Sequence, residues 1–178
     1  TVTLARAARR SAGASSVVST TVGSVARVNS HWEANRLAYQ LYVLAEYAQA
    51  FDQEGSGQLG IAVRLFDKRH LLSQYGRATL AVALSLLEPD EPDRVHTLLS
   101  DLTGSAILSA TGAHWEEGQP DYRNMNTDIR TTAIVLWALA RLEPDNDLLP
   151  NTVRWLMAMR KQDFWESTQT TAWSLMGL

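Results

Sequence analysis

Cysteine is missing from this sequence of 178 residues. Its absence excludes disulfides, metal sites built on thiolates and any thiol nucleophile within the chain. Long apolar runs are missing too, since none approaches the ~18 residues that a membrane-spanning helix needs. Strong positive charge is also lacking, because the net charge is −3, which is unfavourable for binding nucleic acid. We therefore expect no membrane contact by this chain and no nucleic-acid partner.

Residues 1–30 lack acidic and aromatic side chains but contain four arginines and ten serines or threonines. The rest of the chain contains 12 basic and 19 acidic residues, so it carries a charge of −7. The first segment has no apolar core of the kind that a secretion signal requires. We predict a leader or the edge of a larger domain over residues 1–30, with a targeting peptide as the alternative, and a folded domain over residues 31–178.

One short phrase recurs four times, and each copy has an alanine at its start and a leucine six positions later. The copies begin at Ala38, Ala78, Ala133 and Ala172, with spacings of 40, 55 and 39 residues. Offsets of three and six or seven positions place side chains on one helical face, so each copy predicts a helix. A period of about 40 residues is typical of one helix hairpin in a repeat protein.

Breakers and capping residues predict where these helices begin and end. The same Glu-Pro-Asp sequence follows the second and third copies, at 88–90 and 143–145, and proline cannot continue a helix. Partner helices are predicted over roughly 57–69, 91–101 and 148–161, with Pro92 and Pro150 in first turns, where proline is tolerated. The start signals of the four copies are Ser30 with Glu33, Ser73, Asp128, and Ser167 or Thr168.

The longest spacing contains an insertion. Residues 104–116 contain small and β-branched residues and have no helical periodicity, which predicts a short strand or hairpin, whereas residues 117–126 indicate a surface loop. The fold class is therefore all-α, built from helix hairpins that stack into an open solenoid or a closed ring. Because the last copy ends on an apolar face without a stop signal, we expect a piece of a larger protein.

The His-Trp-Glu-Glu segment at 114–117 has the composition closest to that of a chemical site. A histidine beside carboxylates can bind a metal, but no second histidine or cysteine stands at ligand spacing. We therefore expect a structural turn that buries Trp115. Of the other histidines, only His31 at a helix start is a candidate for a role, and a partly exposed histidine there is the plainer expectation. The histidines without partners in sequence are His31, His70 and His96.

Two acid clusters, at 88–93 and 143–147, resemble the aspartate-rich motifs that bind diphosphate-bound magnesium. Both lie at predicted helix ends, where Asp and Pro are common, so we expect breakers and caps. Four tryptophans could line an aromatic cavity, but helical spacing beside Leu and Met favours core packing. They are Trp137, Trp155, Trp165 and Trp173. With no nucleophile motif or phosphate loop, we predict no catalytic, cofactor-binding or metal-binding residue, no cofactor and no enzymatic activity.

The C-terminal third resembles the thioester-containing helical domain of the α2-macroglobulin and complement family. The similar elements occur in the family's order at residues 131–136, 149–156, Arg160 and 165–172. Residues 38–44, 75–81 and 112–116 are similar to earlier parts of the same domain. The resemblance thus covers about residues 32–178, and it looks strongest toward the bacterial members.

This resemblance implies an α/α toroid, the fold shared by terpenoid cyclases and protein prenyltransferases. It also implies a large parent protein that is secreted or lies in the cell envelope, such as the periplasm. In that family a protease cuts a bait segment, the parent rearranges and the protease is trapped. The implied function is endopeptidase inhibition, and the implied partners are target proteases and other domains of the parent.

The sequence departs from the family at its reactive group. Many members carry a Cys-x-Glu-Gln thioester in this domain, and a chain without cysteine cannot form it. The motif normally precedes the similar helices, so this chain resembles the later part of the domain. Some members use a histidine to direct acyl transfer toward hydroxyls. His31 lies in a comparable region, but residues 1–30 do not align with the family, so we do not transfer that role.

Two further classes are open from the sequence. A helical-repeat binding scaffold of the HEAT type is compatible with the period of about 40 residues. An enzyme on the toroid is the weaker alternative, because prenyltransferase zinc needs a cysteine ligand and cyclases need an aspartate-rich motif. Ring closure separates a toroid from a solenoid, which exposes a long concave face.

Overall fold

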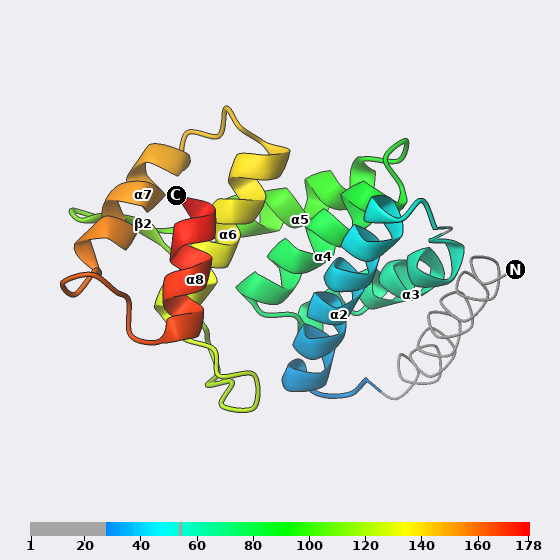
Figure 1. Cartoon of the computed structure of the whole chain (residues 1–178), viewed down its shortest axis with the longest axis horizontal. Coiled ribbons are helices and arrows are strands. Elements are labelled where there is room, and N and C mark those ends of the chain that lie inside the picture. The colour runs from blue at the N-terminus through cyan, green and yellow to red at the C-terminus, as the bar shows by residue number, and fades with distance from the viewer. Residues whose placement is uncertain (1–27, 54) are drawn as a thin grey trace, which may run out of the picture.

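The computed structural model describes residues 28–53 and 55–178, which form an all-α fold with one short β-hairpin (Figure 1). This confirms the fold class predicted from the sequence. The predicted first segment falls mostly on residues 1–27, which lie outside the described residues. The helices are α2 (His31–Ala50), α3 (Ser56–Asp67), α4 (Gln74–Leu87), α5 (Asp93–Gly104), α6 (Asp128–Leu142), α7 (Leu149–Ala158) and α8 (Thr168–Gly177), with a 3-10 turn at Arg69–Leu71.

The four copies of the repeated phrase form helices that lie in one row, in the order α2, α4, α6, α8. Helix α3 packs against α2 and α4, α5 against α4, and α7 against α6, so these three helices form a second layer. Ala38, Ala78 and Ala133 are fully buried, and their small side chains let neighbouring helices approach closely. Each of the first three repeats thus supplies one helix of the row and one covering helix, as the hairpin prediction requires.

The row is curved, because α2 also meets α6 and α8. Tyr42 on α2 lies edge-on to Trp137 on α6, with ring centroids 5.1 Å apart. Tyr39 meets Trp173 on α8 at 6.4 Å, and Arg141 on α6 forms an ion pair with Glu46 on α2. We call the four rings the inner aromatic cluster: Tyr39, Tyr42, Trp137 and Trp173.

Core packing is confirmed for three of the four tryptophans. Trp155, Trp165 and Trp173 are buried, whereas Trp137 is half-buried within the inner aromatic cluster. Trp165 also uses its polar edge, since its Nε1 donates a 2.7 Å hydrogen bond to the carbonyl of Leu156. The tryptophans therefore stabilise several different helix contacts and do not form one cavity.

The fourth copy differs from the others in exposure. Leu136, the third-step leucine of the third copy, is 1% exposed, but its counterpart Leu175 on α8 is 65% exposed. Ala172 and Leu178 in the same copy are exposed as well. The repeat therefore presents on α8 an apolar face that α2, α4 and α6 bury.

The observed helix ends agree with the predicted breakers, whereas several of the predicted capping residues at the helix starts make no capping hydrogen bond. Helices α4 and α6 end directly before the two Glu-Pro-Asp sequences, as predicted. Thr127, and not Asp128, caps α6, because Thr127 Oγ1 accepts a 3.2 Å hydrogen bond from the Arg130 amide. Ser167 caps α8 as predicted. Ser30 and Ser73 precede α2 and α4, but neither hydroxyl makes a capping hydrogen bond.

Two partner helices also differ from their predicted bounds. Helix α5 begins at Asp93 because Pro92 stands at its cap, and it continues to Gly104. Helix α7 ends at Ala158, before the predicted residue 161, because Lys161 and Phe164 pair in a tight turn. No helix in the described part of the chain is long and apolar enough to span a membrane.

The predicted insertion at 104–116 contains the hairpin of β1 (Ile107–Ser109) and β2 (Gly112–His114), which pair antiparallel. Helix α7 packs against β2. Gly112 has φ +137°, and a Cβ there would overlap the Asn151 carbonyl and lie 2.9 Å from Trp155 Cβ. Only glycine adopts this backbone conformation readily, so Gly112 permits the close contact between the hairpin and α7.

Candidate functional site

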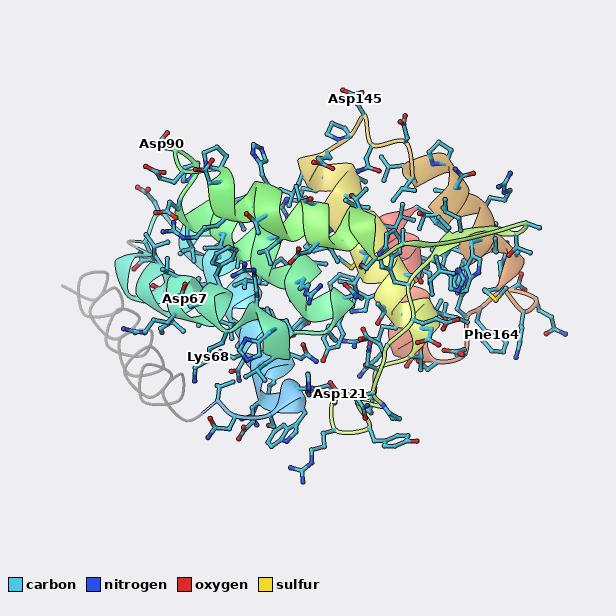
Figure 2. The ribbon with its side chains drawn as sticks, turned by 180° about the vertical axis from the view of Figure 1, so that it is seen from behind. Asp67, Lys68, Asp90, Asp121, Asp145 and Phe164 are labelled. Atoms are coloured by element: carbon cyan, nitrogen blue, oxygen red, sulfur yellow. The ribbon has the colours of Figure 1, made fainter. Side chains whose placement is uncertain are left out.

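The candidate site lies where α2, α4 and α6 begin. The segment of residues 115–127 crosses this end of the helices, and Asp121 points toward it in Figure 2. We call the connected side chains the polar rim. Its members are Asn35, Tyr75, Glu117, Asp121, Asn124, Asn126, Arg130 and Thr131.

Asp121 is the acceptor that joins the crossing segment to two helices. Its Oδ2 accepts hydrogen bonds from Tyr75 Oη at 2.9 Å, from Asn124 Nδ2 at 2.7 Å and from Asn35 Nδ2 at 3.4 Å. Burial acts to raise the pKa of Asp121, but the hydrogen bonds from Asn124 and Tyr75 outweigh it and bring the pKa below its usual value. The carboxylate is therefore held ionised against α2 and α4.

Glu117 anchors the same segment to α6. Its Oε1 accepts hydrogen bonds from Thr131 Oγ1 at 2.6 Å and from Asn126 Nδ2 at 3.1 Å. Its amide donates a 2.9 Å hydrogen bond to Asp128 Oδ1, the residue that the sequence suggested as a cap. Burial raises the pKa of Glu117, although the Thr131 hydrogen bond lowers it. Neighbouring carboxylates at 117 and 121 thus have pKa values shifted in opposite directions.

Asn35 completes the contact between α2 and α4. Its Oδ1 accepts a 3.0 Å hydrogen bond from the Ser73 amide. A Cβ at Gly76 would overlap this amide oxygen, so glycine at 76 leaves the space that buried Asn35 occupies. The start of α4 is therefore held by a side chain from another helix.

Arg130 is the buried cation of the polar rim. It is 7% exposed, and its guanidinium carbon lies 5.3 Å from the centroid of the Tyr75 ring. Nη1 donates a 2.9 Å hydrogen bond to Asn126 Oδ1, whereas buried Nε has no hydrogen-bond partner. Burial lowers the pKa of Arg130. A buried guanidinium with an unused donor is costly unless something else pairs with it.

Two hollows flank Asn35, which lines both. One, of about 610 Å³, is lined by His31, Trp32 and Glu117 among others. The other, of about 430 Å³, lies toward α8 and is lined by three arginines and by the rings of Tyr39, Tyr75 and Trp173. Both volumes fall within the range of ~300–1,000 Å³ that is usual for small-ligand sites.

The burial of Trp115 predicted for the His-Trp-Glu-Glu segment is confirmed, but the predicted turn is wrong, because His114 ends strand β2 and residues 115–117 are an extended connection without turn geometry. Trp115 is fully buried, and its Nε1 donates a 2.8 Å hydrogen bond to the Leu102 carbonyl. His114 stacks on Trp155 with ring centroids 4.6 Å apart and 1° between the planes, and its Nε2 lies 3.3 Å from Glu116 Oε1. Within residues 28–53 and 55–178, no three His, Cys, Asp or Glu side chains are grouped as a metal would need.

The remaining histidines and the acid clusters do not belong to the polar rim, although His31 lines the adjacent hollow of about 610 Å³. His31 is exposed at the first position of α2, as expected, and its Nδ1 lies 2.8 Å from the Leu71 carbonyl oxygen. His70 and His96 are exposed. The acid clusters act at helix ends, since Glu88 pairs with Arg94 at 2.6 Å and Glu143 accepts a 2.7 Å hydrogen bond from Asn146.

Asp121 and Arg130 were missed in the sequence analysis, and Glu117 was considered there only as part of the 114–117 segment and not as a partner of α6. Residues 117–126 have no helix or strand, as the predicted surface loop requires, and Tyr122 there is 85% exposed. Yet the two acids of this segment point toward the helices. A loop has no periodicity that could separate inward from outward side chains, so no sequence signal showed that these two acids point inward.

The polar rim holds its carboxylates as hydrogen-bond acceptors, and each already has two or more donors. Such an arrangement fixes the crossing segment on the helix starts and presents arginine donors beside it. No protein-family model matches the chain, and no curated protein matches it at a significant level.

Proposed function

We propose that this chain is a non-catalytic part of an α2-macroglobulin-like protein that traps attacking proteases. The resemblance of residues 32–178 to the helical thioester domain of that family motivates the proposal. In this role the chain forms part of the helical body and edge of a toroid, and it contributes no atom that reacts with the protease. The parent protein would act outside the cell or in its envelope.

The contact of α2 with both α6 and α8 is the observation that carries this proposal. Tyr42 reaches Trp137, and Tyr39 reaches Trp173, so the row of helices curves strongly. A toroid requires such curvature, whereas an open solenoid keeps helices two or three repeats apart from touching. The inner aromatic cluster therefore supports the toroid over the repeat scaffold.

The exposed face of α8 fits a larger assembly. Leu175 repeats a position that is buried in the three earlier copies, and it is 65% exposed. A further structural unit could pack on exposed apolar side chains at a repeat position and bury them. In the proposed parent this unit would be another helix pair of the toroid or a neighbouring domain.

The test begins with the gene on both sides of this sequence. We expect a long reading frame with a secretion signal, and the full-length protein should block cleavage of casein by trypsin while cleavage of a small chromogenic peptide continues. That difference separates enclosure of the protease from active-site inhibition. A Cys-x-Glu-Gln upstream would add covalent capture, and its absence would leave trapping by enclosure. A reading frame that comprises only these residues would contradict the proposal.

A repeat scaffold that binds another protein has one observation in its favour. Val43, Tyr47 and Phe51 are exposed and spaced by four residues, so they form an apolar stripe along α2. If the full-length protein leaves casein cleavage unchanged, this stripe makes the scaffold the leading alternative.

A further inference from the structure

We propose that the hollow of about 430 Å³ between the starts of α2, α4, α6 and α8 binds an acidic peptide segment, with a carboxylate against its arginines and an apolar side chain against its rings. We call this hollow the arginine pocket. The proposal concerns a binding site on this chain and does not rest on protease trapping.

The charged side chains that line the arginine pocket are all positive. Arg36, Arg123 and Arg130 line it, and no aspartate or glutamate does. Among residues 28–53 and 55–178, none of the three forms an ion pair within 4.0 Å. Asp121, the nearby acid of the polar rim, is already bound by Tyr75 and Asn124. The pocket therefore offers positive charge without a resident carboxylate.

The arginines are held in place by aromatic rings. The guanidinium carbons of Arg36 and Arg123 lie 5.0 Å and 4.5 Å from the Trp32 ring centroid. Arg130 lies against Tyr75 in the same way. Cation–π contacts of this kind position a guanidinium but leave its in-plane donors available. Those donors match the two oxygens of a carboxylate.

Arg130 provides the second, independent observation. Its side chain is more than nine-tenths buried, it lines the pocket, and Nε lacks a hydrogen-bond partner. Asp121 interacts with this buried cation electrostatically but forms no ion pair with it within 4.0 Å, so a bound carboxylate would add a direct acceptor. The same contact would give a partner to Nε, the Arg130 donor that has none.

The apolar side of the pocket decides between an acidic peptide and a simple inorganic anion. Tyr39 and Trp173 form one wall in an edge-to-face pair, with Met125 and Ala172 nearby in the lining. An inorganic anion would leave this wall uncovered. An aspartate or glutamate flanked by an apolar residue would cover it, and burial of that apolar surface would add to the affinity.

The test uses calorimetric titration of the 178-residue chain with acetyl-Leu-Asp-Leu-amide. Its neutral match, acetyl-Leu-Asn-Leu-amide, should bind about tenfold more weakly, as expected for loss of a charge-assisted contact. Arg36→Gln and Arg123→Gln change exposed arginines and should each weaken binding of the Asp peptide several-fold. Arg154→Gln, an exposed arginine on α7 that pairs with Asn151, is the matched control and should leave binding unchanged.

Arg130→Lys tests the buried cation, and thermal unfolding of the same variant shows whether it folds. A folded Arg130→Lys should lose the Asp peptide, because lysine cannot replace the planar donor pair. Equal binding of the Asp and Asn peptides, or unchanged binding in Arg36→Gln and Arg123→Gln, would overturn the proposal. Inorganic phosphate binding as tightly as the Asp peptide would overturn the peptide assignment and leave a site for small anions.

Discussion

Tyr75 on α4 donates a 2.9 Å hydrogen bond to Asp121, which lies 46 residues later in the segment that crosses the helix starts. The Tyr75 side chain is almost fully buried, so its hydroxyl cannot exchange this partner for bulk water. Burial, together with the negative charge of Asp121, raises the pKa of Tyr75. The phenol therefore stays protonated and acts as the donor that ties this segment to the row of helices.

Tyr75→Phe should lower the free energy of unfolding by about 1.5–3 kcal/mol, the usual range for hydrogen bonds to charged groups. The ring and its packing are retained, so the loss reports the hydrogen bond. Urea unfolding measures it. Tyr122→Phe is the matched control, because Tyr122 belongs to the same segment and is 85% exposed. Equal stability of the two variants would show that the Tyr75–Asp121 bond contributes nothing.

Ionisation of Glu117 should cause the free energy of unfolding to fall as pH rises. Burial raises its folded pKa, so the folded protein holds a proton that the unfolded chain, with a glutamate pKa near ~4.3, has already released. The contribution of this group is therefore fully present below that value and is lost as pH rises through the folded pKa.

Glu117→Gln removes the titration but keeps an Oε1 acceptor for Thr131 and Asn126. We expect the variant to gain stability relative to the unaltered chain as pH rises above the unfolded glutamate pKa of ~4.3, measured by urea unfolding at a series of pH values. Glu91→Gln, at an exposed position in the turn before α5, should leave the pH profile unchanged. A Glu117→Gln profile parallel to that of the unaltered chain would rule out the assigned shift.

Gly112 should tolerate no side chain. Its positive φ and the contact with Asn151 and Trp155 predict that Gly112→Ala costs at least the ~1–3 kcal/mol of an overpacked site, with backbone strain in addition. Gly118→Ala is the control, because a Cβ there meets nothing within 4 Å. Thermal unfolding compares them, and a Gly112→Ala melting temperature equal to that of Gly118→Ala would refute the close contact between β2 and α7.

Removal of the third-step leucine should lower the free energy of unfolding more in the third copy of the repeat than in the fourth, although both copies have leucine there. Leu136→Ala removes a fully packed side chain and should cost about 2–5 kcal/mol. Leu175→Ala changes its exposed counterpart on α8 and should stay within about 0.5 kcal/mol. Urea unfolding of both variants decides this, and a large loss for Leu175→Ala would mean that the 178-residue chain buries the α8 face, for example against a second copy of itself.

Much of the fold could be predicted from local patterns. The alanine–leucine spacing located α2, α4, α6 and α8, and the Glu-Pro-Asp breakers located two helix ends, because both patterns act within one or two helical turns. The hairpin within 104–116 was predicted from missing helical periodicity. Helix starts were less accurate. Asn35 on α2 accepts a hydrogen bond from the Ser73 amide at the start of α4. Nothing in the sequence near Ser73 indicates this contact.

The sequence by itself determined which segments are helical, the period of about 40 residues and the burial of Trp115, because each depends on short-range periodicity or on one large apolar side chain. Only the tertiary structure decided that Glu117 and Asp121 face inward, that Arg130 lies buried beside Arg36 and Arg123, and that Leu175 is exposed where Leu136 is not. These outcomes depend on which helices meet across the curved row. Contacts such as those of Asp121 with Tyr75 and Asn35, which are 46 and 86 positions away, leave no spacing that a single sequence could show.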